Sequence, residues 1–251
     1  MAATTTTAGS TRSRLAAAIA FACLITGAVA IGASAPADAV KPKILGHTKK
    51  TPKPSCPTPE QTPFPPRKGC QVFGEVTGFQ IRANGKRGLM KAPADGKIVA
   101  WSVDLARPDP AERKFFSEVL GDRAFNGAPT ARLSILTRAK KRKFRLRAQS
   151  PTQNLKSLLD RRHYFTLNNP ISVKKGWIAA LTSQTWVPNF AHNLPGDDLW
   201  RASREPGRCD APPQANLTER SRPHLGVGST RTYGCSYNDA RLLYWAYFVK
   251  D

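Results

Sequence analysis

The sequence predicts an all-β domain of stacked sheets over residues 69–251, and three observations support this prediction. Short apolar runs with a period of two recur between turns rich in Gly, Pro and Asp. Only one stretch carries good signals of a helix. Two further runs, WIAALT at 177–182 and ARLLYWAYFV at 240–249, are apolar on both faces, which is typical of central, buried strands.

The first 39 residues have the pattern of an export signal. Arg12 and Arg14 precede an uncharged run over 15–37, and Ala37-Asp38-Ala39 matches a small-x-small cleavage site. The run is also long enough to be an uncleaved membrane anchor, although its many Ala and Gly residues insert weakly. We therefore expect a secreted or cell-surface protein, with contact to a membrane only if the segment is retained.

Residues 40–68 are rich in Pro, Lys and Thr and contain almost nothing to bury. This composition predicts an extended, semi-rigid tether, with a disordered leader as the alternative.

Four cysteines lie beyond the signal: Cys56, Cys70, Cys209 and Cys235. An even number in an exported chain indicates disulfides. Of the possible pairings we favour Cys56 with Cys70 and Cys209 with Cys235, because each closes a short loop within one region. A zinc site is the competing interpretation. The chain has no C-x-x-C pair, and His224 is the one histidine near the later cysteines, so we expect neither metal nor cofactor.

The domain begins with two short runs, CQVFGEV and TGFQIRA, interrupted by Gly74 and Gly78. After a turn at 93–96, KIVAWSVDLA alternates as a half-buried strand, which predicts Trp101 in the core. The helix follows, with Asp109 as N-cap, Pro110 at its first position, Glu112 completing a capping box and Gly121 ending an apolar stripe over 115–120. We expect this helix to cover an open end or edge of the strands.

ARLSILT at 131–137 and KFRLRAQ at 143–149 predict a hairpin that turns over 139–142. It holds the densest charge in the chain, on Arg138, Lys140, Lys141, Arg142, Lys143, Arg145 and Arg147. The pattern fits either a polyanion-binding patch or a solvated turn whose charge protects an edge strand. Phe144 is the one aromatic residue here and alternates inward with Leu146, so a specific nucleic-acid partner is not expected.

Residues 163–183 predict three short strands, two of them joined as a hairpin through the turn Lys174-Lys175-Gly176. The loop that follows carries an adjacent acidic pair, Asp197 and Asp198, whose neighbours in the sequence include aromatic residues. Such a pair can bind calcium or a sugar, but the alternating oxygen ligands of a calcium loop are missing. The alternative is a solvated acidic turn. WRASR at 200–204 predicts a further short strand.

Five stretches together resemble a family of secreted bacterial proteins with a jelly-roll-like β-sandwich and no assigned activity. They are ADGKIVAWSVDL, ARLSIL, FTLNNPISVKKGWIAALTSQTWVPNF, WRASR before Cys209, and YGCSYNDARLLYWAYFV. The resemblance implies this fold for most of residues 70–249 and implies no catalytic or ligand residues. The basic hairpin is not part of the shared pattern.

The sequence carries no G-x-S-x-G, no H-E-x-x-H and no glycine-rich phosphate loop. A net charge of +22 predicts attraction to polyanions. We expect a non-catalytic extracellular module that adheres to an anionic cell-wall polymer or glycan, in an oligomeric state that the sequence does not specify. The alternatives are a purely structural surface protein and a glycan-cleaving enzyme that uses Asp197 or Asp198. Exposure of Trp186, Trp200 or Tyr237 on a concave face would favour a ligand, and burial would favour the structural role.

Overall fold

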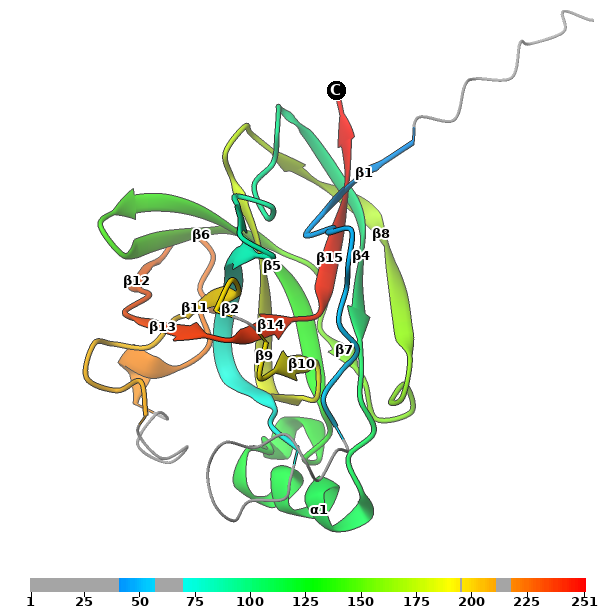
Figure 1. The fold of residues 1–251 in the computed structure, drawn as a ribbon. Coiled ribbons are helices and arrows are strands. Elements are labelled where there is room, and N and C mark those ends of the chain that lie inside the picture. Colours follow the sequence, from blue (N-terminus) through cyan, green and yellow to red (C-terminus); the bar gives the residue numbers. More distant parts are fainter. Residues whose placement is uncertain (1–40, 57–69, 195, 211–217) are drawn as a thin grey trace, which may run out of the picture. The chain divides into compact units, whose positions relative to one another are not determined.

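The computed structural model describes residues 41–56, 70–194, 196–210 and 218–251. The expected signal at 1–39 and residues 40 and 57–68 of the expected tether lie outside these ranges. The described chain is mostly antiparallel strands that curl into a half-barrel, with one α-helix (Figure 1). The predicted all-β sandwich is thus confirmed.

The larger sheet carries the basic hairpin. Among the described residues its strands are, in spatial order, β12 (Thr230–Thr232), β6 (Lys143–Gln149), β5 (Thr130–Lys140), β9 (Ile178–Val187), β2 (Phe73–Ala83), β11 (Leu199–Ala202) and β13 (Cys235–Asn238). Two short strands are attached beside this path, β3 (Lys86–Arg87) on β2 and β7 (Gln153–Asn154) on β5. β9 is buried along almost its whole length, as its apolar run predicts.

The second sheet has the order β1 (Lys43–Leu45), β15 (Tyr244–Lys250), β4 (Gly96–Asp104) and β8 (Arg162–Val173). A two-stranded sheet pairs β10 (Phe190–His192) with β14 (Ala240–Leu242). The C-terminal run is therefore two strands, and β15 is central in its sheet as predicted. Trp101 of β4 is fully buried between the sheets, as its period-two pattern predicts.

Residues 43–55 belong to the folded domain, which corrects the prediction of a tether for this stretch. Lys43, Ile44 and Leu45 pair with β15, and Leu45 is buried. Farther along, the Ser55 amide donates to the carbonyl of Phe190 at 2.9 Å. The composition was misleading because a short edge strand needs only one buried side chain when its backbone hydrogen bonds are supplied by a neighbouring strand.

The Lys174-Lys175-Gly176 turn does not close a hairpin. β8 and β9 flank it, but β8 pairs with β4 in one sheet while β9 pairs with β2 and β5 in the other. The turn therefore carries the chain from sheet to sheet. The predicted three short strands in this region are two long ones, because Pro170 lies in β8 at the sheet edge, where its missing N–H costs no ladder bond.

β2 is likewise one continuous strand rather than two runs broken at glycines. The predicted helix is confirmed as α1 (Pro110–Val119), with both hydrogen bonds of the capping box between Asp109 and Glu112. It lies at one end of the sheets (Figure 1), where Phe116 packs on Trp186 with ring centroids 5.3 Å apart. Two single-turn 3-10 helices, η1 (Arg123–Phe125) and η2 (Glu219–Ser221), lie in loops.

Both favoured disulfides are present, Cys56 with Cys70 and Cys209 with Cys235. The first joins the N-terminal segment to the start of β2. The second ties the long loop before β13 to the strand β13 itself. Two disulfides in one small domain are typical of an oxidising, extracellular compartment.

Candidate functional site

The basic hairpin is formed by β5 and β6, as predicted. Arg138 is opposite Phe144 and Lys140 is opposite Lys143, which leaves Lys141 and Arg142 as the two turn residues. Arg142 has φ 59°, the left-handed conformation that tight hairpin turns require. The alternation along β6 is confirmed, because Phe144 and Leu146 are buried while Arg145 and Arg147 are exposed.

All seven cations of the basic hairpin are exposed, and within the described ranges none of them forms an ion pair. They do not share one face. Arg138 lies on the face of Phe144, because directly opposite residues of an antiparallel pair point to the same side. Arg147 lies on the other face, with Cζ 5.5 Å from the ring centroid of Trp177 and Nε donating to Thr137 Oγ1 at 3.1 Å. The hairpin therefore presents positive charge on both sides.

A shallow groove opens beside the hairpin on the Phe144 face. Its volume is about 350 Å³, and Phe79, Met90, Phe144 and Ile178 supply apolar lining. The cations that line it are Arg87, Lys91, Arg138 and Arg201. We call this the basic groove. Three of its cations come from outside the hairpin, and the sequence offers no signal for them, since positions 87, 91 and 201 are brought beside position 138 by strand pairing alone.

The positive charges along the basic groove repel each other. Burial lowers the pKa of the Arg201 guanidinium, and the positive charges of Arg142 and Arg138 lower it further. Arg201 reaches this position because it lies on β11, where it pairs with Phe79 of β2 on one side and Ser236 of β13 on the other. A group of like charges held together without carboxylates between them favours the binding of an anion.

The acidic pair at 197–198 is split by the fold, so the prediction of a solvated acidic turn is wrong for Asp198. Asp197 is exposed, but Asp198 is 2% exposed and forms an ion pair with Arg241 at 2.7 Å. A carboxylate fixed in this way is not a solvated turn residue. The sequence could not show this, because the partner lies 43 residues away.

The aromatic residues considered as a ligand platform are mostly inside. Trp186 and Trp200 are 1% and 5% exposed. Tyr237 is half-buried, stacks on Trp200 with ring centroids 4.5 Å apart, and donates its hydroxyl to the carbonyl of Cys209. None of these three rings has a face exposed for stacking on a sugar or a base.

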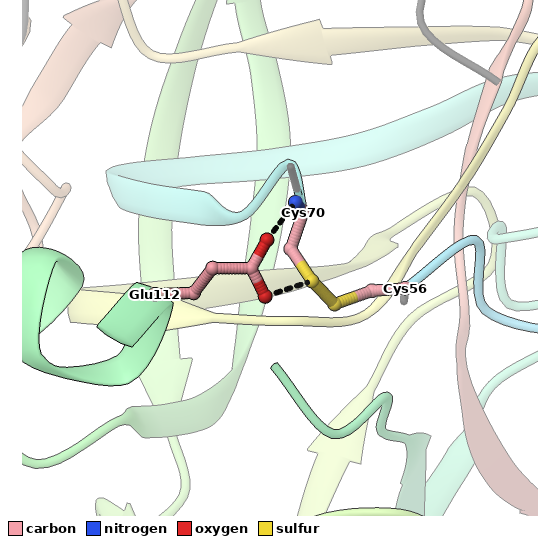
Figure 2. Close-up of side chains that lie close together, drawn as sticks. All are labelled: Cys56, Cys70 and Glu112. Atoms are coloured by element: carbon pink, nitrogen blue, oxygen red, sulfur yellow. Dashed lines mark hydrogen bonds between the residues drawn. A yellow bond between two sulfur atoms is a disulfide. The ribbon is translucent and has the colours of Figure 1, made fainter. Parts of the chain in front are cut away.

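Cys56, Cys70 and Glu112 lie close together where the N-terminal segment meets α1 (Figure 2). The Cys70 amide donates to Glu112 Oε1 at 2.7 Å, and Cys70 Sγ lies 3.0 Å from Oε2. Because both sulfurs are committed to the disulfide, they are not thiolate ligands. The cluster instead connects the capping box of α1 to the first disulfide.

Within the described ranges, no helix is long and apolar enough to cross a membrane. Comparison with protein families, with curated proteins and with solved structures finds no match to this chain.

Proposed function

We propose that this protein is an exported, non-catalytic module that adheres to an anionic cell-wall polymer or glycan through the basic hairpin and the basic groove. The observation that carries the proposal is the set of exposed hairpin cations that have no acidic partner in the described structure. The disulfides and the signal-like leader support export.

The chemistry of the surface favours repeated anionic groups over a single small ligand. Side chains on both faces of the hairpin and along the basic groove offer ammonium and guanidinium donors over an extended area. Phosphodiester and carboxylate groups accept charge-assisted hydrogen bonds from both donor types. Because the aromatic lining of the groove is buried and offers no stacking platform, a carbohydrate or polyol-phosphate polymer suits the surface better than single-stranded nucleic acid.

Binding to two defined polyanions tests the proposal, namely poly-glutamate and a glycerol-phosphate teichoic acid. The test variant replaces Lys140, Lys141 and Lys143 by Ser, which leaves the buried face of the hairpin intact. The control variant replaces Arg107, Lys114 and Lys156 by Ser. These cations are also exposed, and Lys114 lies on α1 at the other end of the sheets (Figure 1).

We expect the hairpin variant to lose most of its affinity for both polymers and the control, with the same change in net charge, to lose little. Equal losses in the two variants would show that binding follows net charge alone and would reject the site. Absence of binding by the unmodified protein at low salt would favour the purely structural role, which the burial of Trp186 and Trp200 otherwise supports.

A further inference from the structure

A second hollow, separate from the basic groove, opens beside Glu75 on β2. Its volume is about 750 Å³, a size typical of small-ligand pockets. Six ionisable side chains line it, three acidic and three basic. The acidic ones are Glu75, Asp122 and Glu219, and the basic ones are Arg123, Arg222 and Arg231. In a chain with a net charge of +22, such a lining has far less positive charge than the basic hairpin.

Glu75 is set into this hollow by an irregularity of the sheet. Gly74 is opposite Trp186 and Val76 is opposite Ser183, so one residue of β2 faces two residues of β9. Glu75 has φ 46°, a region that few non-glycine residues occupy. One of its carboxylate oxygens is buried and has no hydrogen-bond partner in the described structure. An ionised carboxylate is costly in such a place, whereas a protonated one is tolerated and donates a hydrogen bond.

Burial favours the protonated form of Glu75, against the opposing charges of two guanidiniums. Burial raises the pKa of Glu75 to about 7, with Arg222 and Arg204 lowering it and Asp122 raising it. Asp122 comes from η1, Gln184 from β9, Glu219 from η2 and Arg231 from β12. Arg231 is already engaged, because its Nη1 donates to the carbonyls of Glu219 and Arg222.

Gln184 provides a second donor whose orientation is fixed. Its Oε1 accepts from Arg132 Nη2 at 2.9 Å and from Thr152 Oγ1 at 3.1 Å. With the oxygen held in this way, the amide NH₂ is the polar group of Gln184 that is left for a ligand in the hollow that this residue lines. Glu75 and Gln184 therefore lie in the same β-bulge, on β2 and β9, and both line the hollow.

We propose that this hollow, the Glu75 cleft, binds a unit of a neutral, hydroxyl-rich sugar, with Glu75 and the Gln184 amide as hydrogen-bond partners of its hydroxyl groups. With Glu75 protonated, two carboxylates remain beside three guanidiniums, and this small net charge favours a neutral ligand over a highly charged one. Planar carboxylate, guanidinium and amide groups each offer two polar atoms side by side, which matches neighbouring hydroxyls. Pro223 and Leu225 add apolar lining for the C–H faces of a sugar ring.

Calorimetric titration of the full mature chain with maltotriose, cellotriose and chitotriose tests this inference. We expect at least one trisaccharide to bind, and Glu75→Ala and Gln184→Glu each to weaken it about fivefold or more. Gln184→Glu is the sharper variant, because a carboxylate oxygen still accepts from Arg132 and Thr152 while the amide donor is gone. Glu118→Gln, on the exposed side of α1, is the matched control and should bind normally.

The protonation of Glu75 gives a second readout. Wild-type affinity should fall between about pH 5 and pH 9, whereas Glu75→Gln, which keeps a donor at every pH, should bind with little pH dependence. Identical pH profiles for the two proteins would overturn the role of Glu75. No binding of any of the three sugars at up to about 10 mM would overturn the site itself.

The outcome is independent of the polyanion proposal. The Lys140, Lys141 and Lys143 to Ser variant should bind the trisaccharide as the wild type does, and added salt should have little effect, because the ligand carries no charge. Loss of trisaccharide binding in that variant would contradict the assignment of the ligand to the Glu75 cleft.

Discussion

At the scale of single residues, the buried Arg241 has four hydrogen-bond acceptors around its guanidinium. It is 3% exposed and donates to Asp198, to the Thr48 hydroxyl, to the carbonyl of Lys50 and to Asn84 Oδ1. These acceptors come from the N-terminal segment, the β2–β3 turn and the loop before β11. The guanidinium therefore joins three segments that are far apart in the chain, at a place where a buried charge is tolerated only with full hydrogen bonding.

Asp198→Ala tests this role. The change leaves the Arg241 charge buried without its counter-ion, so we expect the free energy of unfolding to fall by about 3–5 kcal/mol. Urea unfolding measures the difference. Asp197→Ala is the control, since that carboxylate is exposed and its loss should change the free energy by less than about 0.5 kcal/mol. Similar results for the two variants would show that the ion pair contributes nothing particular.

Glu75 and His224 give opposite dependences of stability on pH. Burial, with the charge of Arg231, lowers the pKa of His224 to about 4, so this ring stays neutral in the fold and stability falls as the pH drops below its ordinary range. The raised pKa of Glu75, about 7, acts the other way. Between the ordinary carboxyl pKa and 7 the folded chain keeps a proton that the unfolded chain has released, so stability falls as the pH rises.

Comparing Glu75→Gln with the wild type isolates the Glu75 effect. The variant should gain stability relative to the wild type as the pH rises from about 5 to 8, by of order 1 kcal/mol once solvent screening of this partly exposed group is allowed for. Chemical unfolding at several pH values measures the gain. A difference between the two proteins that stays constant over this range would mean that Glu75 ionises normally in the fold.

At the scale of elements, β1 decides where the domain begins. Leu45 is 2% exposed and Ile44 is 38% exposed, although the two are adjacent on the same short strand. Leu45→Ala should lower the free energy of unfolding by about 2–5 kcal/mol, because it opens a cavity in the core. Ile44→Ala should cost much less. If denaturation shows both changes to be neutral, the segment behaves as the tether that its composition predicts.

The elements that the sequence predicts well are those with strong local signals. The capping box of α1, the alternation of β6 and the apolar run of β9 all depend on neighbours within a few residues. Pairing is different. The turn at 174–176 has the local sequence of a hairpin turn. The two strands that it joins nevertheless pair with other strands, β8 with β4 and β9 with β5.

At the scale of the whole molecule, the candidate sites also differ in whether the sequence alone reveals them. The basic hairpin is contiguous in the chain and can be found by counting charges. The basic groove and the Glu75 cleft cannot, because Arg201, Gln184 and Glu75 are ordinary residues in sequence. They become a site only when β2, β9 and β11 lie side by side. Fold class and charge are thus predictable here, and the shape of a binding site is not.

The salt dependence of polyanion binding tests the central claim most directly. The logarithm of the association constant for the glycerol-phosphate polymer should fall steeply with the logarithm of salt concentration, because each bound phosphate releases counter-ions. The slope should become shallower by about one unit for each cation removed from the basic hairpin. It should stay nearly unchanged in the Arg107, Lys114 and Lys156 variant. Equal slopes for the wild type and the hairpin variant would contradict the account.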